Sequence, residues 1–386
     1  IVKACKVNLS KIKLIHINGE FLYRGNNNYD GLISEIEITS DVIKKEKEVL
    51  NYINDLKPLA EKNTCPSIPM GNHCKKPYPC IYQDKCKDDE RKNNFTSYKI
   101  LPWCSKEIKE YCEENKIMDL QKVPEKFLLK NRKNFAKHYY KIIQEAHKNN
   151  EPWFNQDLKK VLKKFSFPFY FMDFEYVDQG VPIIKNTKPY VKLPFQWSVH
   201  KWESENNEID KGKSFLKFND QDIERQFIES LLDAVGDKGT IFAHSAKLAE
   251  VKILEEFKEK SNCKDLLGKI DKLIKRIEDT YILVGENFYS PLMNGKYKIK
   301  NIIKAIPNCP INYEEKDNIA GGDDAQLAWF ICTDPKTNEK NIENQKKFLE
   351  DYCSKDTLAV YYLIKYLMEE SKNEKKFNYK ISENCS

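Results

Sequence analysis

The sequence contains no apolar stretch that is long enough to cross a membrane. No hydrophobic run reaches the roughly 20 residues of a transmembrane helix, and no signal peptide is recognisable near its start. These absences argue against a membrane protein and against a secreted one. We therefore expect a soluble, cytoplasmic protein that has no membrane partner.

The chain also lacks a strong charge of either sign. Its 386 residues include 65 Lys and Arg against 59 Asp and Glu, which gives a formal net charge of +6. A nucleic-acid partner is compatible with this charge but is not indicated by it, because the electrostatic footprint of such proteins is a clustered basic patch. The length suffices for two or three domains with a sizeable core.

Cysteine is abundant, but the C-x2-C pair that is typical of zinc ribbons is missing. Three of the twelve cysteines instead follow a C-x5-C-x5-C spacing: Cys74, Cys80 and Cys86. Clustered cysteines without a secretion signal indicate a metal or cluster site, although three unpaired thiols explain the spacing equally well. Zinc and iron–sulfur sites need a fourth ligand, for which the candidates are Cys65, Cys104, His73 or a residue upstream. The other cysteines, Cys353 among them, are expected to be ordinary core or surface residues.

Residues 169–177 (FYFMDFEYV) predict a buried strand, because they are aromatic and β-branched and are followed by turn residues. Asp173 and Glu175 lie two positions apart, so their side chains point to the same face of that strand. Two adjacent carboxylates on an apolar strand repel each other and lose hydration. A divalent cation would relieve that cost. The alternative is a strand end whose acids are simply solvated.

Composition and periodicity divide the chain into five segments: a partial α/β module (1–60), a Cys-rich segment (61–95), a small helical linker domain (96–164), a mixed α/β domain (165–372) and a flexible charged tail (373–386). In the first segment, Asn18-Gly19 predicts a hairpin between strands at 11–17 and 20–24. A further strand at 32–38 and a helix at 42–61 follow. In the linker domain we expect helices at 105–114, 124–127 and 131–147.

The fourth segment alternates strands and helices. Its pattern predicts strands at 169–177, 193–201, 212–218 and 239–244, and helices at 220–235, 248–260, 266–277 and 348–368. Three strands, a helix, a strand and then helices are typical of a mixed α/β fold. The expected fold class is therefore α/β, with a mixed sheet flanked by helices.

Tyr352 and Asp356 lie four positions apart in the last predicted helix, so they share one of its faces. Alone they are compatible with capping or ordinary hydrogen bonding. Together with Asp173 and Glu175 they resemble the tyrosine-bearing DEDD exonucleases of the RNase H-like superfamily, over most of residues 166–370. The resemblance places the middle acid at Glu250, one residue later than the family pattern. It leaves Asp279 as the next candidate for that acid.

A closer resemblance extends over the whole chain. Five segments are similar to the bacterial domain of unknown function family DUF2779: 171–175 (FMDFE), 193–198 (LPFQWS), 289–291 (YSP), 296–300 (KYKIK) and 352–358 (YCSKDTL). Members of that family join a RecB-like nuclease module of the PD-(D/E)XK type to an exonuclease-like domain. The resemblance implies that residues 1–60 are the end of the first module, whose catalytic acids and lysine have no match in this chain.

The resemblance also implies cofactors. In relatives of RecB, three late cysteines and one early cysteine hold an iron–sulfur cluster, which implies Cys74, Cys80 and Cys86 as ligands and places the fourth ligand upstream of this chain. The exonuclease-like domain implies two ions of Mg²⁺ or Mn²⁺, because hard cations prefer oxygen ligands. The acids that the sequence offers as their ligands are Asp173, Glu175, Glu250, Asp279 and Asp356.

These ions activate water and stabilise the leaving oxygen of a phosphodiester, and Tyr352 would orient the attacking water. We therefore expect a two-metal-ion exonuclease that acts on DNA or RNA, with a 3′–5′ polarity implied by the resemblance. The alternatives are a nucleic-acid-binding module with a degenerate exonuclease site and a structural protein with a cysteine-based clip. Alternation predicts that Lys296, Lys298 and Lys300 line one strand face, which either meets phosphates or is a solvated edge.

Overall fold

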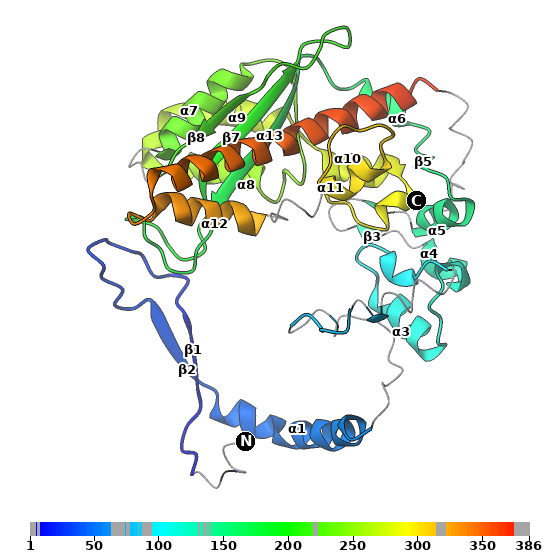
Figure 1. The fold of residues 1–386 in the computed structure, drawn as a ribbon, viewed down its shortest axis with the longest axis vertical. Coiled ribbons are helices and arrows are strands. Elements are labelled where there is room, and N and C mark those ends of the chain that lie inside the picture. The colour runs from blue at the N-terminus through cyan, green and yellow to red at the C-terminus, as the bar shows by residue number, and fades with distance from the viewer. Residues whose placement is uncertain are drawn as a thin grey trace. The chain divides into compact units, whose positions relative to one another are not determined.

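The computed structural model describes residues 5, 8–62, 74, 78–83, 85–86, 95–129, 132–133, 137–138, 140–218, 223–313 and 322–373. The chain splits into two compact units, drawn in Figure 1. The first unit comprises Ile1–Phe95 and Asp178–Val191, and the second comprises Thr96–Val177 and Lys192–Ser386. Among the helices in these described ranges, none has both the length and the apolarity to span a bilayer.

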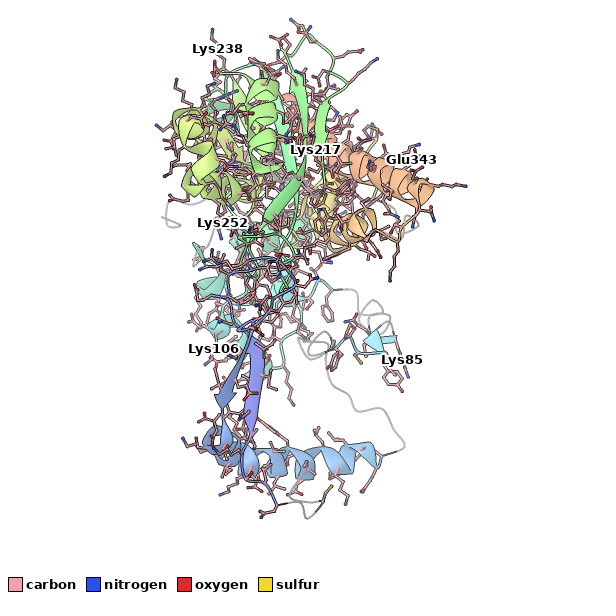
Figure 2. The ribbon with its side chains drawn as sticks, turned by 90° about the vertical axis from the view of Figure 1, so that its left-hand side faces the viewer. Lys85, Lys106, Lys217, Lys238, Lys252 and Glu343 are labelled. Carbon is pink, nitrogen blue, oxygen red and sulfur yellow. The ribbon has the colours of Figure 1, made fainter. Side chains whose placement is uncertain are left out.

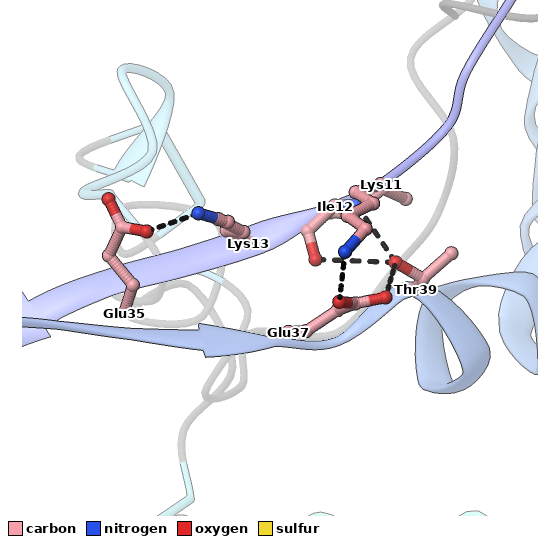
Figure 3. A network of polar contacts seen from close by, with 6 residues as sticks. All are labelled: Lys11, Ile12, Lys13, Glu35, Glu37 and Thr39. Carbon is pink, nitrogen blue, oxygen red and sulfur yellow. Dashed lines mark hydrogen bonds and ion pairs between the residues drawn. The ribbon is translucent and has the colours of Figure 1, made fainter.

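The first unit contains a two-stranded antiparallel sheet, β1 (Lys13–Ile17) with β2 (Ile33–Glu37), followed by helix α1 (Thr39–Ala60). Thr39 joins the start of α1 to the sheet, as Figure 3 shows. Its hydroxyl oxygen accepts a hydrogen bond from the backbone N–H of Ile12 at 2.9 Å and lies 3.2 Å from the Glu37 carboxylate. The side chains of Lys11 and Glu37 pair beside it, with 3.5 Å between Nζ and Oε2.

The hairpin predicted at Asn18-Gly19 is wrong. The partner of β1 is β2, and residues 20–24 form no strand. The backbone N–H of Tyr23 instead donates to the carbonyl of Thr187 at 3.0 Å, and its carbonyl accepts from the N–H of Asn186 at 2.7 Å. A contact between segments this far apart in sequence overrides the local turn signal.

The second unit is built on a five-stranded mixed sheet in the order β10-β9-β6-β7-β8. Strand β7 runs antiparallel to both β6 and β8, whereas β9 runs parallel to both β6 and β10. The bounds are β6 (Phe169–Val177), β7 (Leu193–Trp202), β8 (Lys213–Leu216), β9 (Thr240–Ala243) and β10 (Ile277–Asp279). The mixed α/β class and the first four strands are confirmed, and β10 is a strand that the sequence pattern did not predict.

The two faces of this sheet belong to different cores, because successive residues of β6 point to opposite sides. Tyr170, Met172 and Phe174 lie in a core with three helices: α7 (Ile223–Val235), α8 (Glu250–Glu259) and α9 (Leu267–Lys275). Phe169 and Phe171 lie in the other core, which includes the apolar side of the long helix α13 (Glu339–Glu370). Helix α12 (Gly322–Thr333) packs beside α13 (Figure 1).

Shorter elements complete the second unit. Before β6 they are η2 (Tyr98–Ile100), α3 (Lys106–Glu114), η3 (Leu120–Lys122), α4 (Glu125–Leu128), β3 (Arg132–Lys133), β4 (Lys137–His138), α5 (Tyr140–Asn149), β5 (Trp153–Phe154) and α6 (Leu158–Leu162). Later in the chain they are η4 (Ser261–Leu266), α10 (Thr280–Asn287), β11 (Phe288–Tyr289), η5 (Pro291–Met293), α11 (Ile299–Ile302) and η6 (Ile303–Ala305).

The predicted linker helices are only partly correct. Helix α3 begins as expected, because Ser105 caps it by accepting a hydrogen bond from the N–H of Ile108 at 3.2 Å. The helix expected at 131–147 is wrong in its first half, where β3 and β4 form an antiparallel pair. Helix α5 starts only at Tyr140, whose buried ring belongs to the core.

Candidate metal site between a central strand and the last helix

Strand β6 supplies two carboxylates to the sheet face that α13 covers. Asp173 and Glu175 alternate with Met172 and Phe174, which point into the opposite core. Glu175 is buried, with 8% of its surface exposed, and Asp173 is partly buried. An otherwise apolar strand thus holds two acids where water hydrates neither of them well.

Polar contacts fix helix α13 across β7. The side-chain amide of Gln196 donates to the carbonyl of Leu349 at 2.8 Å. One residue after Asp356, Thr357 Oγ1 lies 2.8 Å from His200 Nδ1. All four residues come from elements that pack together, and the contacts hold the turn that contains residues 352–356 against the acidic face of β6.

The thiol of Cys353 contacts Asp173 directly. Its Sγ donates to Oδ2 of Asp173 at 3.4 Å and lies 3.6 Å from the carbonyl oxygen of the same residue. One ligand atom from each of Asp173, Glu175 and Cys353 lies within 4.8 Å of the other two. In the described part of the chain, this is the only group of three or more His, Cys, Asp and Glu side chains that is close enough to hold a metal ion.

Asp356 of α13 is a third carboxylate, and its charge acts on both acids of β6. Burial, and then the negative charge of Asp356, raise the pKa of Asp173 well above its ordinary value. The same two causes raise the pKa of Glu175 to about 8. Burial also raises the pKa of Asp356 itself, to about 6. The charge of Asp356 therefore makes both acids of β6 harder to ionise.

Two tyrosines accompany Asp356. The hydroxyl of Tyr313 donates to Oδ1 of Asp356, and this hydrogen bond partly offsets the effect of burial on the pKa of that acid. Burial, followed by the charge of Asp356, raises the pKa of the Tyr352 hydroxyl and of the Tyr313 hydroxyl. Both hydroxyls therefore stay neutral and are able to donate hydrogen bonds.

Glu250 opens helix α8 and is buried, with 2% of its surface exposed. Burial raises its pKa to about 8, although the backbone amide of Phe174 on β6 acts in the opposite direction. The charge of Glu250 also raises the pKa values of Asp173 and Glu175, although burial and the charge of Asp356 have larger effects. Its Oε2 atom is buried and has no hydrogen-bond partner in the described residues. Glu250 and Asp356 thus act electrostatically on the acids of β6, but neither belongs to the group whose ligand atoms lie within 4.8 Å of one another.

Three of these acids lie on the stretch of chain that runs from β6 to α8. Residues 170–298 match the family model DUF2779, a domain of unknown function. The predicted resemblance to DUF2779 is confirmed over these residues, which include Asp173, Glu175 and Glu250. The DUF2779 match ends before α13, so it does not include Tyr352 or Asp356. Comparisons with curated proteins and with solved structures gave no match.

Asp279, the other candidate acid in the DUF2779 region, binds backbone instead. Its two carboxylate oxygens accept hydrogen bonds at 3.0, 3.0 and 2.9 Å from the N–H groups of Ser245, Lys247 and Tyr281. The last of these bonds caps helix α10. Asp279 affects the acidic site only through its charge. Burial is the main cause of the raised pKa of Glu250, and the negative charge of Asp279 raises it further.

The strand predicted for the lysine-rich end of the DUF2779 region is wrong. Lys298 is the residue before the short helix α11, and Lys300 lies inside that helix, so the three lysines share no strand face. The charge of Lys300 nevertheless reaches Asp356, where it lowers the pKa while burial raises it more strongly. Other lysines of the second unit, such as Lys217 and Lys238, point outward at separate places on the surface (Figure 2).

The cysteine segment lies outside the DUF2779 region, in the first unit. The N–H of Cys80 donates to the carbonyl of Cys74 at 2.9 Å, and the side chain of Gln83 donates to the same carbonyl at 3.0 Å. The N–H of Cys86 donates to the carbonyl of Tyr82 at 3.1 Å. Two of the proposed fourth ligands, Cys65 and His73, fall outside the described residues. The third, Cys104, is buried in the second unit.

Two residues of the site were not anticipated. Cys353 was expected to be an ordinary residue, yet its position three before Asp356 puts both on one face of a helix, which is a signal that the sequence does contain. Tyr313 lies in a loop 43 residues before Asp356, and no spacing rule connects the two.

Proposed function

We propose that the second unit is a metal-dependent nuclease, namely a two-metal-ion 3′–5′ exonuclease that acts on DNA or RNA. The observation that carries this proposal is that ligand atoms of Asp173 and Glu175 on β6 lie within 4.8 Å of Cys353 on α13, far away along the chain. The charges of Asp356 on α13 and of Glu250 on α8 act on both acids of β6. A cluster of buried acids with raised pKa values is costly to stability, and such clusters are found preferentially at functional sites.

The residues fit divalent cations. Asp173, Glu175, Glu250 and Asp356 offer oxygen ligands, which suit Mg²⁺ or Mn²⁺. The buried Oε2 of Glu250 lacks a hydrogen-bond partner in the described residues, and an unsatisfied buried acceptor is a position that a cation can fill. When bound, the ions would supply a nucleophile from water and neutralise charge on the leaving oxygen.

The side chains around the acids would position the attacking water and attract the substrate. Tyr352 presents a neutral hydroxyl beside Asp356, which is suited to orienting an attacking water through a hydrogen bond. Lys300 and Lys355 carry positive charge near Asp356 and would attract the phosphates of a nucleic acid. The apolar strand and the long helix exclude other water from the acids.

We further propose that the sheet is RNase H-like. Its support is the placement of the acid-bearing strand β6 at the centre of a mixed sheet, with the acid-bearing helix α13 across one face. The RecB-like origin of residues 1–60 and the iron–sulfur role of Cys74, Cys80 and Cys86 rest on the sequence resemblance alone.

The test is degradation of labelled single- and double-stranded DNA and RNA by the full chain with Mn²⁺ or Mg²⁺. We expect stepwise shortening from the 3′ end that a chelator stops. Asp173→Asn should reduce the rate about 100-fold or more, because the bound ions contribute several kcal/mol to the transition state. The matched control is Asp233→Asn, which changes an exposed acid of α7 and should leave the rate unchanged.

Two other outcomes would point elsewhere. If the strand is bound but stays intact with both metals, the site is a degenerate one in a nucleic-acid-binding module. If the protein neither binds nor degrades any of these strands, the structural alternative is favoured.

A further inference from the structure

The acidic site contains a sulfur atom that the proposed exonuclease chemistry does not use. Cys353 is fully buried, with 0% of its surface exposed, and its Sγ points at the carboxylate of Asp173 from 3.4 Å. A metal site made only of oxygen ligands does not need Cys353, because Asp356 on the same face of α13 already supplies a carboxylate from this helix. The thiol of α13 therefore lies beside the two acids of the strand.

The spacing of the donor atoms fits a single ion. The ligand atoms of Asp173, Glu175 and Cys353 lie within 4.8 Å of one another. Ligands that bind one zinc-like ion at about 2.0–2.3 Å lie no more than about 4.6 Å apart. A small movement of side chains would therefore close this set around a cation, with the helix and the strand in their present positions.

A second observation points to a ligand at the same place. Glu250 is buried and its Oε2 has no hydrogen-bond partner in the described residues. It comes from a different element, α8, and its charge acts on both Asp173 and Glu175. Glu250 is not among the atoms that lie within 4.8 Å of one another, so a buried acceptor of this kind is suited to hold a water on the ion rather than to bind the ion directly.

We propose that Asp173, Glu175 and Cys353 form a mixed oxygen–sulfur site for a borderline transition-metal ion of the Zn²⁺ or Co²⁺ class. Thiolate is a soft ligand that selects such ions, whereas Mg²⁺ binds oxygen. On binding, the thiol releases its proton to solvent and the sulfur becomes an anionic ligand. The inference rests on the metal-binding part of the proposed function, and it assigns a Zn²⁺- or Co²⁺-class ion, in place of Mg²⁺ or Mn²⁺, to the one of the two positions that Cys353 adjoins.

The probe is Co²⁺ alone, added to the full-length protein and followed by absorption. A cobalt–thiolate bond gives a charge-transfer band in the near ultraviolet, whereas oxygen ligands give only weak visible bands. Cysteines elsewhere, such as those of the Cys-rich segment, contribute a background, so each variant is compared with the parent protein by difference spectra. We expect one component of the charge-transfer band to be lost in Cys353→Ser and the same component to be lost in Asp173→Asn.

The matched control is Cys332→Ser, because the thiol of Cys332 lies 3.9 Å from the carbonyl of Ile342 in another part of the unit. This variant should keep the component. Cys353→Ala serves as a second variant if the serine protein does not reach the parent's unfolding temperature, and it should lose the same component.

The outcomes separate this inference from the proposed function. If the visible cobalt bands depend on Asp173 but the charge-transfer band is unchanged in both Cys353 variants, the metal site stands and the sulfur ligand is refuted. If no cobalt signal depends on Asp173, the metal site itself is refuted. Equal loss in Cys332→Ser would also overturn the inference, because the effect would then not be specific to the site.

Discussion

Tyr313 donates a hydrogen bond to Oδ1 of Asp356, so a loop residue 43 positions upstream controls one oxygen of the last acid of the site. The ammonium of Lys355 lies 5.1 Å from the centre of the Tyr313 ring, within the range of a cation–π contact. Burial raises the pKa of Asp356 to about 6, and the Tyr313 hydrogen bond and the charge of Lys355 act against it, so the value stays below that of about 8 at Glu175. Asp356 is therefore the more readily ionised of these two acids.

Tyr313→Phe should raise the pKa of Asp356, because the hydrogen bond that stabilises its carboxylate is lost. The affinity for Mn²⁺ should then fall near pH 6, by roughly tenfold if the bond is worth 1–2 kcal/mol, and should recover by about pH 9. Titration calorimetry at several pH values measures this. Tyr362→Phe, on the same helix α13, is the control. A variant with parental affinity at every pH would show that Tyr313 does not act on Asp356.

The stability of the metal-free protein should depend on pH through Glu175. Its pKa is raised from 4.5 to about 8, so the folded state binds its proton more tightly than the unfolded state. The resulting contribution to the free energy of unfolding is fully present below about pH 4.5. It is lost as the pH rises from about 4.5 to about 8.

Glu175→Gln should flatten this decline, because the amide cannot ionise, and should stabilise the metal-free protein by up to about 5 kcal/mol at pH 9, at about 1.4 kcal/mol for each unit by which the pKa is raised. Urea unfolding between pH 5 and pH 9 in the presence of a chelator measures the difference. Asp233→Gln, at an exposed position of α7, should leave the slope unchanged. Parallel pH curves for the parent and Glu175→Gln would contradict the raised pKa.

Mn²⁺ should stabilise the folded protein, because it binds the acids only where the fold brings them together. At a concentration 100 times its dissociation constant, a ligand adds about 2.7 kcal/mol to the free energy of unfolding. The unfolding temperature should therefore rise with Mn²⁺ for the parent protein, and Asp173→Asn should abolish the rise. A rise of the same size in the variant would place the ion somewhere other than β6.

Asp279→Ala should destabilise the protein by about 1–3 kcal/mol, since three backbone N–H groups lose their acceptor and α10 loses its cap. Its affinity for Mn²⁺ should change by less than that of Asp173→Asn. Chemical unfolding and calorimetry on the same samples compare the two effects. If Asp279→Ala loses the metal but keeps its stability, Asp279 is a ligand rather than a cap.

The sequence predicts the acidic strand and the acidic helix because both depend on local periodicity. Asp173 and Glu175 follow the period of two of a strand, and Tyr352 and Asp356 follow the spacing of a helix turn. The mixed α/β class follows from the order of these elements. Local pattern also places Glu250 at the start of a helix, which is where the structure has it.

What the sequence does not predict depends on contacts between distant segments. Residues 20–24 bind the turn at Asn186 and Thr187 rather than forming a hairpin. Strand β10 has only three residues, directly after a helix, and exists because it pairs with β9. The contact between Tyr313 and Asp356 leaves no periodic trace, because Tyr313 lies in a loop.

The central claim is that acids from β6 and α13 share a divalent cation. The most direct measurement is an anomalous difference map from a crystal of the full chain soaked in Mn²⁺. We predict a peak within about 2.0–2.6 Å of carboxylate oxygens from Asp173 and Asp356, the range of bonds to hard cations. A map with no peak between these two residues, from crystals that take up Mn²⁺ elsewhere, would contradict the account.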